Sequence, residues 1–205
     1  ICGITSVIDA RIISEFNIHA IGLNFIERSK RKIDLKTSKE IIKELPIFIG
    51  TILVLEDKKI KDVISLCDSL STNNVQLHGN ESPEYCKELK NKKKDIKIIK
   101  ALKAEEETLQ ILKEYEKACD FILLDSANSK KQMGGTGKTA DWKIAKKIVE
   151  KSKLPVILAG GLNPKNIKDA IKKVKPYAID INSGVESKPG KKNKDLIEEL
   201  LSQIQ

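Results

Sequence analysis

A thiol and a carboxyl group each belong to a short apolar run, one at the start of the chain and one in its middle. Cys2 lies in the run Ile1–Ile4, and Asp125 ends the run Phe121–Asp125. Both groups can exchange a proton near neutral pH when their surroundings shift their pKa values. Such a pair suits a reaction in which one group removes a proton while the other delivers one. The pair therefore predicts general acid/base chemistry of the kind that isomerases perform.

Two apolar runs near the end of the chain each lead into a turn of small residues. The run Val156–Ala159 leads into Gly160–Gly161, and the run Ala178–Asn182 leads into Ser183–Gly184. Glycine lets the backbone turn tightly and brings bare N–H groups close to a ligand. Asn163 follows the first turn and is expected to cap a helix, whose N-terminus favours an anion. The two turns together predict a phosphate-binding cup.

A regular alternation of strand-like and helix-like stretches would bring these residues together. The chain contains eight short apolar runs: Ile1–Ile4, Ala20–Phe25, Ile47–Val54, Val75–His78, Ile96–Leu102, Phe121–Asp125, Val156–Ala159 and Ala178–Asn182. Amphipathic stretches separate these runs, and this pattern predicts an α/β fold with a parallel sheet. Eight units favour a single (β/α)8 TIM barrel of eight parallel strands, covering residues 1–205, over an open doubly wound sheet. The carboxyl ends of the strands would share one rim, and Lys100 is also expected there.

The composition favours an enzyme of small molecules over a membrane or nucleic-acid protein. No apolar run approaches the ~18 residues of a membrane span. The net charge of +9 comes mainly from lysine, and aromatic residues make up only 4%, whereas nucleic-acid sites favour arginine stripes with interleaved aromatics. A positive field still attracts a small anionic substrate. The four cysteines show no C-x-x-C spacing, which indicates a reduced, cytoplasmic compartment.

Signals for a metal or a cofactor are weak in the sequence. His19 and His78 are the two histidines, so no histidine cluster suggests a metal. The segment Gly134–Thr139 ends like a P-loop, but the first required glycine would fall at Gln132. No G-x-G-x-x-G follows an early strand, so a nicotinamide cofactor is not supported. We expect neither a metal nor a cofactor.

Seven motifs in a fixed order span essentially the whole chain. They are Ile1–Thr5, Ser29–Arg31, Val75–Gly79, Gly134–Gly137, Asp141–Trp142, Gly160–Pro164 and Asp180–Glu186. In this order they resemble the phosphoribosylanthranilate isomerase family. The resemblance implies a cofactor-free (β/α)8 barrel that serves tryptophan biosynthesis. It also implies the Amadori rearrangement of N-(5-phosphoribosyl)anthranilate to 1-(o-carboxyphenylamino)-1-deoxyribulose 5-phosphate.

The resemblance implies catalytic roles for the thiol and the carboxyl group. Asp125 would protonate the furanose ring oxygen and open the ring to a Schiff base, and the thiolate of Cys2 would then remove the proton from C2 of the sugar. Burial or a nearby anion would favour a protonated Asp125, and a positive environment would favour the thiolate of Cys2. Arg31 would pair with the anthranilate carboxylate through its planar fork.

The remaining motif positions are expected to bind the rest of the substrate. Asp180 would hydrogen-bond the sugar hydroxyl groups, and Gln76 would orient its neighbours. His78 is also expected at the substrate; it could be mistaken for the base, and it is equally a structural hydrogen-bonding group. The phosphate is expected to bind backbone N–H groups of the two turns and of a loop that closes over the substrate, at Gly135, Gly137, Gly160, Gly161, Ser183 and Gly184.

Departures from the family pattern leave alternatives open. The family usually has a lysine before the Ile-Cys-Gly run, so strand 1 looks clipped at the N-terminus. The nearest alternative function is the related barrel isomerase of histidine biosynthesis, which performs the same rearrangement on a bisphosphate with two aspartates. A non-catalytic barrel that binds a phosphorylated metabolite is the other alternative.

The expected partner is a small phosphorylated substrate, with no nucleic acid and no membrane. The chain is expected to be a monomer or a homodimer.

Overall fold

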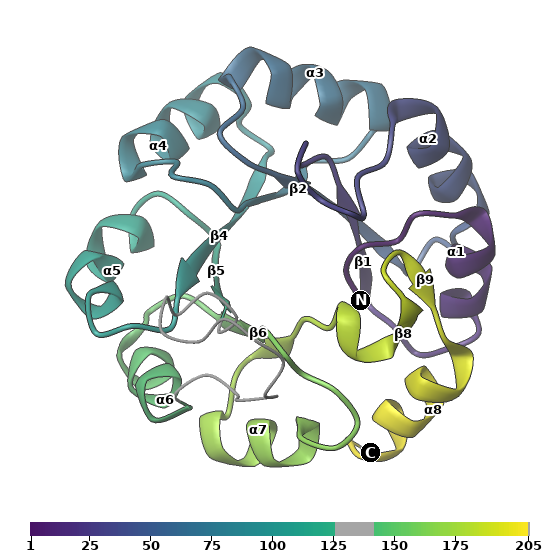
Figure 1. The fold of residues 1–205 in the computed structure, drawn as a ribbon. Coiled ribbons are helices and arrows are strands. Elements are labelled where there is room, and N and C mark those ends of the chain that lie inside the picture. Colours follow the sequence, from purple (N-terminus) through teal and green to yellow (C-terminus); the bar gives the residue numbers. More distant parts are fainter. Residues whose placement is uncertain (126–141, 205) are drawn as a thin grey trace.

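A curled parallel sheet lies at the centre of the molecule, and helices surround its outer side (Figure 1). The computed structural model describes residues 1–125 and 142–204. The sheet runs in chain order through β1 (Ala20–Asn24), β2 (Gly50–Leu55), β3 (Asn74–Leu77), β4 (Lys97–Lys103), β5 (Phe121–Asp125), β6 (Val156–Ala159) and β7 (Ala178–Ile179). The helices are α1 (Val7–Ser14), α2 (Leu35–Glu44), α3 (Ile60–Leu70), α4 (Pro83–Lys92), α5 (Thr108–Glu116), α6 (Trp142–Lys151), α7 (Ile167–Val174) and α8 (Lys194–Ser202). Every neighbouring pair of these strands is parallel, which confirms the α/β prediction.

Side chains of the strands alternate between the interior of the curled sheet and the helix layer. Ile99, Leu123 and Ala159, on three adjacent strands, pack together in the interior. Their neighbours Leu124 and Leu158 belong to the larger core beneath the helices. This period of two is that of strands buried on both faces. Residues two places apart on a strand point to the same face, so Asp125, the last residue of β5, points to the interior as Leu123 does.

The expected first strand, Ile1–Ile4, does not form a strand. It makes an isolated parallel bridge between Cys2 and Gly22 of β1. On its other side, Cys2 N donates to Ile181 O at 2.9 Å, so the segment lies between β1 and the chain that follows β7. Gly3 has a φ of +74°, which breaks the extended backbone that a longer strand needs. The described part of the chain therefore has a parallel sheet of seven strands rather than the eight expected.

The third expected strand begins later than the apolar pattern predicts. The run starts at Ile47, but β2 begins at Gly50, because Pro46 opens a turn in which Ile49 N donates to its carbonyl oxygen at 3.0 Å. Ile47 and Phe48 are left 90% and 88% exposed. Two large apolar side chains therefore project into solvent at the amino end of a strand.

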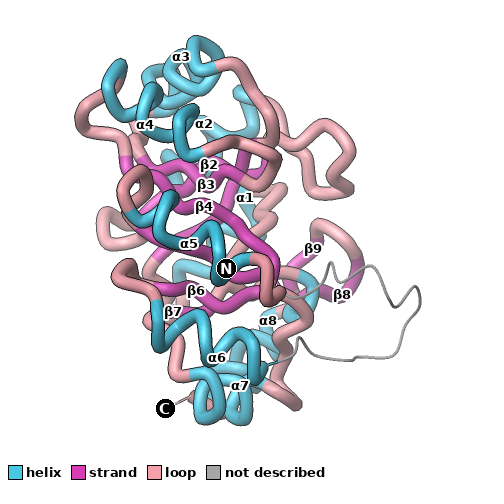
Figure 2. Tube along the Cα trace, turned by 90° about the vertical axis from the view of Figure 1, so that its left-hand side faces the viewer, coloured by secondary structure: helices cyan, strands magenta, loops and turns pink. Residues whose placement is uncertain are grey.

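An antiparallel hairpin that the sequence pattern does not predict follows the last parallel strand. A 3₁₀ turn (Ser183–Val185) leads into β8 (Glu186–Lys188) and β9 (Lys191–Lys192), with Gly190 at a φ of +81° in the turn between them. Figure 2 shows this hairpin at one end of the sheet. Lysine side chains usually lie in solvent, but Lys192 is only 2% exposed. The hairpin therefore places the buried ammonium group of Lys192 at the end of the sheet where β8 and β9 lie.

The helices begin where local sequence signals place their starts. Ser6, Asp34, Ser82 and Asn193 each accept a hydrogen bond from a backbone N–H of the first turn that follows, which satisfies groups that the helix itself leaves unpaired. Pro83 stands at the start of α4, where its missing N–H has no consequence. Among residues 1–125 and 142–204, no helix combines the length and the apolar character that a membrane crossing requires.

Candidate active site

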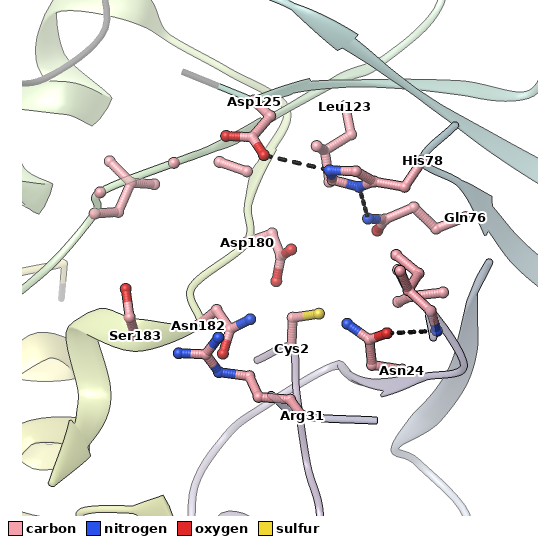
Figure 3. A pocket seen from close by; sticks show the side chains of 16 residues that line it. Cys2, Asn24, Arg31, Gln76, His78, Leu123, Asp125, Asp180, Asn182 and Ser183 are labelled. Atoms are coloured by element: carbon pink, nitrogen blue, oxygen red, sulfur yellow. Dashed lines mark hydrogen bonds and ion pairs between the residues drawn. The ribbon is translucent and has the colours of Figure 1, made fainter. Parts of the chain in front are cut away.

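A cavity of about 290 Å³ opens among the carboxyl ends of the parallel strands. Figure 3 shows side chains from separate segments of the chain pointing into this one space. Nine residues that the sequence predicts for the site line the cavity: Cys2, Arg31, Gln76, His78, Asp125, Gly160, Gly161, Asp180 and Ser183. The fold thus brings the expected thiol, the expected carboxyl group and residues of both glycine turns to the same rim.

Cys2 is nearly buried, with 7% of its surface exposed. Gly22 of β1 leaves room for the thiol, because a Cβ on that glycine would stand 2.7 Å from the sulfur. Burial, assisted by the charge of Asp180, raises the pKa of the Cys2 thiol to about 12. The pKa of Asp180 is itself raised by burial. The thiol therefore holds its proton at neutral pH in this structure, and the expectation that its surroundings favour the thiolate is wrong here.

Asp125, His78 and Gln76 form a chain of polar contacts along the cavity wall. The Nε2 atom of His78 lies 3.4 Å from Oδ2 of Asp125, and its Nδ1 atom lies 3.1 Å from Nε2 of Gln76. An amide NH₂ group only donates, so Nδ1 accepts, and a neutral ring carries its proton on Nε2. That N–H faces the carboxyl group of Asp125. The arrangement favours the structural alternative for His78, because it holds the imidazole against the carboxyl group.

Arg31 lines the cavity while its guanidinium forms a two-point ion pair with Glu186. Nε lies 2.8 Å from Oε1 and Nη2 lies 2.5 Å from Oε2. Burial would raise the pKa of Glu186, but hydrogen bonds from Arg31 and Lys192 hold that pKa below its ordinary value. The guanidinium of Arg31, which the sequence assigns to a substrate carboxylate, is thus aligned by the carboxylate of Glu186. Its third nitrogen, Nη1, does not take part in this ion pair.

Lys192 supports this ion pair from the hairpin side. Its Nζ atom donates to Oε1 of Glu186 at 3.0 Å and to both oxygens of Asn182 at 3.1 Å. Burial lowers the pKa of Lys192, and the hydrogen bond to Glu186 opposes that fall. Sequence reasoning missed Glu186, Lys192 and Asn182, since their pairing depends on a hairpin that the apolar pattern does not reveal. The one available signal was that Asn182 and Glu186 belong to a family motif.

The two glycine turns touch each other at the rim. A Cβ on Gly184 would overlap the carbonyl oxygen of Leu162, so only glycine lets the turns approach this closely. Gly161 has a φ of +66°, and no atom lies within 4 Å of the place where its Cβ would stand, so its backbone borders open space. As expected, Asn163 caps the turn that leads into α7: its side-chain oxygen accepts from Lys165 N at 2.9 Å, and its carbonyl oxygen accepts at 3.0 Å from the N–H of Ile167, where α7 begins.

Of the expected site residues that the structure describes, Gly184 and Lys100 do not line this cavity. Gly135 and Gly137 lie outside the described residues. Lys100 lies on the helix side of β4, since Ile99 before it faces the interior and successive side chains alternate. It is 1% exposed and hydrogen-bonds the segment that follows β3. Within residues 1–125 and 142–204, no group of three or more His, Cys, Asp or Glu side chains is arranged to hold a metal ion.

The curled parallel sheet, with a thiol, a carboxyl group and two touching glycine turns on one rim, defines the class of protein: a TIM-barrel enzyme of small phosphorylated molecules. The sequence model of N-(5'-phosphoribosyl)anthranilate (PRA) isomerase matches residues 1–203. The chain belongs to this family, which confirms the resemblance seen in the sequence motifs.

Individual relatives match the chain over its length. N-(5'-phosphoribosyl)anthranilate isomerase of Petrotoga mobilis is 39% identical over 205 residues, covering 100% of this chain and 95% of the relative. The enzyme of the same name from Methanocella arvoryzae is 35% identical over 206 residues, covering 100% of this chain and 96% of the relative.

Solved structures carry the same architecture. Phosphoribosyl anthranilate isomerase from Thermotoga maritima matches with a TM-score of 0.88 at 34% identity, covering 99% of this chain and 96% of that chain. A structure of phosphoribosyl anthranilate isomerase in complex with reduced 1-(o-carboxyphenylamino)-1-deoxyribulose 5-phosphate has a TM-score of 0.84 at 32% identity, covering 98% and 95% of the two chains. The TIM-barrel architecture predicted from the alternation is therefore shared with enzymes of this family.

Proposed function

We propose that this chain isomerises N-(5-phosphoribosyl)anthranilate to 1-(o-carboxyphenylamino)-1-deoxyribulose 5-phosphate in tryptophan biosynthesis, with Asp125 as the acid and Cys2 as the base. The observation that carries the proposal is that these two groups and both glycine turns border one cavity, in a chain of the phosphoribosylanthranilate isomerase family. A relative of known structure binds the reduced form of the product, which supports a substrate with the same carbon skeleton here.

The first step opens the ribose ring. Asp125 delivers a proton to the ring oxygen, the bond between that oxygen and C1 breaks, and the lone pair of the anthranilate nitrogen forms the double bond of a cationic Schiff base. The carboxyl group must hold a proton for this step and must point at the ring oxygen. The Nε2 atom of His78, 3.4 Å from Oδ2 of Asp125, restricts the orientation of the carboxyl group.

The second step removes the proton from C2 of the sugar. The thiolate of Cys2 takes that proton, the electron pair forms a C1–C2 double bond, and the Schiff-base nitrogen becomes neutral; the resulting enol then tautomerises to the ketone. Because the pKa of the thiol is about 12, the thiol must first release its proton to solvent once the substrate is bound. A cationic Schiff base beside the sulfur favours ionisation, so the acid step prepares the base step.

The rest of the substrate is assigned to the surrounding residues. Asp180 hydrogen-bonds sugar hydroxyl groups, and Gln76 and His78 border the sugar from β3 and the segment after it. The phosphate binds backbone N–H groups of the two turns, at Gly160, Gly161, Ser183 and Gly184, and of the closing loop at Gly135 and Gly137. The open space beside Gly161 and the contact between the two turns support this assignment.

Arg31 is assigned to the carboxylate of the anthranilate ring. The Nη1 atom, which does not take part in the ion pair with Glu186, is the proposed donor. Replacing Arg31 by alanine is expected to weaken binding of anthranilate-bearing ligands about 10- to 100-fold, the range for loss of a charge-assisted hydrogen bond. Binding of ribose 5-phosphate should change little. Calorimetric titration with both ligands measures the difference, and Arg31→Lys, which keeps the charge but not the fork, is the control. Equal losses for the two ligands would contradict the assignment.

The whole chain, residues 1–205, is proposed to form one barrel domain of eight parallel members. The segment Ile1–Ile4 acts as the eighth member, because hydrogen bonds join it to Gly22 on one side and to Ile181 on the other. Closure of this kind leaves no unpaired strand edge in the sheet. It also fixes Cys2 at the rim, opposite the carboxyl end of β5.

A second copy of the chain is proposed as the protein partner. Ile47 and Phe48 are exposed at the amino ends of the strands, and an apolar cavity of about 340 Å³, bordered by Ile18, Tyr177 and Leu201, opens on the same side. A structure of monomers generated from the dimeric phosphoribosylanthranilate isomerase of Thermotoga maritima matches at 31% identity and a TM-score of 0.84, so the parent enzyme of that structure is a dimer. Exposed apolar side chains of this size are typical of an interface.

The double variant Ile47→Ser/Phe48→Ser is expected to halve the molar mass that light scattering measures, because the apolar contacts of the interface are lost. Turnover should persist, since these residues lie at the end of the sheet away from the active-site cavity. Ile8→Ser, at a side chain of α1 that is 68% exposed, is the control and should leave the mass unchanged. If the wild-type chain is monomeric at micromolar concentration, the proposed dimer is contradicted and the chain acts as a monomer.

The function itself is tested with substrate made in situ from anthranilate and phosphoribosyl pyrophosphate. Loss of the substrate's fluorescence on addition of the chain is the expected result. Binding of the substrate without turnover would instead indicate a non-catalytic barrel that holds a phosphorylated metabolite. Turnover of the bisphosphate substrate of the histidine-biosynthesis isomerase, with no turnover of N-(5-phosphoribosyl)anthranilate, would indicate that related enzyme.

A further inference from the structure

A buried ion pair lies directly behind the segment that carries His78. Lys100 of β4 is 1% exposed, and its Nζ atom donates to Leu77 O at 3.2 Å and to Gly79 O at 2.7 Å. These are the residues on either side of His78. A third bond, at 2.7 Å, goes to Oε2 of Glu81. One ammonium group therefore holds the backbone on both sides of the histidine and the carboxylate that follows it.

Glu81 ties the same segment to its other neighbours. It is 4% exposed, and its two carboxylate oxygens accept hydrogen bonds from Asp57 N at 2.8 Å and Gly79 N at 3.0 Å. Its own carbonyl oxygen accepts from the hydroxyl group of Tyr115, on α5, at 2.9 Å. The segment from Leu77 to Glu81 is thus fixed by β4, by the loop after β2 and by α5.

The pair is not needed merely to hold the fold together. Removing two charges from water carries a penalty that a buried ion pair only partly recovers, and well-packed apolar residues often replace such a pair without loss of stability. What an apolar pair cannot supply is the set of directed hydrogen bonds from Nζ to two carbonyl oxygens. The feature that distinguishes this pair is therefore the orientation that it gives to the backbone around His78.

We propose that Lys100 and Glu81 are positioning residues of the isomerase: their ion pair fixes the segment Leu77–Glu81, so that His78 holds the carboxyl group of Asp125 toward the sugar ring oxygen. The proposal rests on the proposed role of Asp125 as the acid. It acts through geometry, because Lys100 lies on the helix side of β4 and does not border the active-site cavity. The path of contacts runs from Nζ of Lys100 through the backbone at His78 to the imidazole and the carboxyl group.

The test removes both charges together, so that neither is left buried alone. In the double variant Lys100→Met/Glu81→Gln, kcat is expected to fall about 10- to 100-fold, the effect of a misplaced catalytic group. KM should stay within about twofold, because the residues assigned to the phosphate and to the anthranilate carboxylate are unchanged. Lys97→Met, on the same strand at a side chain that is 63% exposed, is the matched control and should keep wild-type kcat. Tyr115→Phe, which removes the hydroxyl donor to Glu81 O and leaves both charges paired, should show a smaller loss of kcat and serves if the double variant does not fold.

A second readout follows His78 itself. The chain has two histidines, His19 and His78, so the imidazole ¹⁵N resonances are readily assigned, and His19 is an internal reference. Wild-type His78 is expected to show the neutral tautomer with its proton on Nε2. The double variant should shift these resonances toward a mixture of tautomers, while those of His19 and the spectrum of the Lys97→Met control stay unchanged.

The outcomes separate this proposal from the proposed function. Wild-type kcat in a folded double variant overturns the positioning role, and so does a loss of kcat with unchanged His78 resonances, since the pair would then act by another route. If Asp125→Asn remains fully active, the assignment of the acid fails. In that case the His78 resonances still show independently whether Lys100 and Glu81 set the orientation of the imidazole.

Discussion

Replacing Cys2 by alanine is expected to lower kcat about 100- to 10,000-fold, the range for loss of a general base. The physical reason is that Cys2 presents its thiol to the cavity from its place against Gly22, and alanine has no group that can take the C2 proton. Binding of ribose 5-phosphate should change less than about twofold, because the phosphate is assigned to backbone N–H groups. Steady-state kinetics and calorimetric titration of the same preparation measure the two effects.

The control for this substitution is Cys67→Ala. Cys67 lies on α3, is 1% exposed, and belongs to the core beneath the helices, so its loss should lower the unfolding temperature and leave kcat unchanged. Cys2→Ser should be almost as inactive as Cys2→Ala, since an alkoxide is harder to form than a thiolate and the site already raises the pKa of Cys2 to about 12 by burial. An unchanged kcat in Cys2→Ala would remove the thiol from the mechanism.

The sequence predicts the positions of the strands well where apolar character follows the two faces of a buried strand. The run Phe121–Asp125 coincides with β5, and its last residue reaches the cavity because side chains alternate. The pattern fails where local geometry overrides it. Gly3, with its positive φ, keeps the first run from forming a strand, and Pro46 delays the start of β2.

The site is predicted less completely, because several of its contacts join residues far apart in the chain. Arg31 and Glu186, for example, are separated by 155 positions. Sequence spacing carries no information on such pairs. The residue types at strand ends were sufficient to find Cys2, Asp125 and the glycine turns, but not the carboxylate that aligns Arg31.

Burial explains the two electrostatic features that sequence could not foresee. Nothing in the sequence around Cys2 reveals that the thiol is enclosed beside Asp180, and that enclosure raises its pKa. Likewise, Lys100 is expected at the rim from its place near a strand end, but the alternation turns it toward the helices, where it pairs with Glu81. In both cases the position along the strand was predictable, and the surroundings required the packed fold.

Replacing Asp125 by asparagine is expected to lower kcat about 100- to 10,000-fold, because the amide keeps the shape of the side chain but cannot deliver a proton to the ring oxygen. The contact with His78 can persist, since the amide oxygen still accepts from Nε2. Turnover is measured by the loss of substrate fluorescence. The control is Asp120→Asn at the other end of β5, where the carboxylate pairs with Lys90 at 2.8 Å; it should affect stability and not kcat.

The order of the two steps makes the Asp125 and Cys2 variants distinguishable from each other. If Asp125 opens the ring before Cys2 acts, Cys2→Ala should still form the Schiff base, whereas Asp125→Asn should not accelerate its formation. Borohydride would then reduce the Schiff base to a stable open-chain amine. In the presence of Cys2→Ala, this amine should form faster than it does without enzyme. Asp125→Asn should yield only that uncatalysed background. Equal trapping by both variants would show that Asp125 does not open the ring, and another group would have to supply the proton.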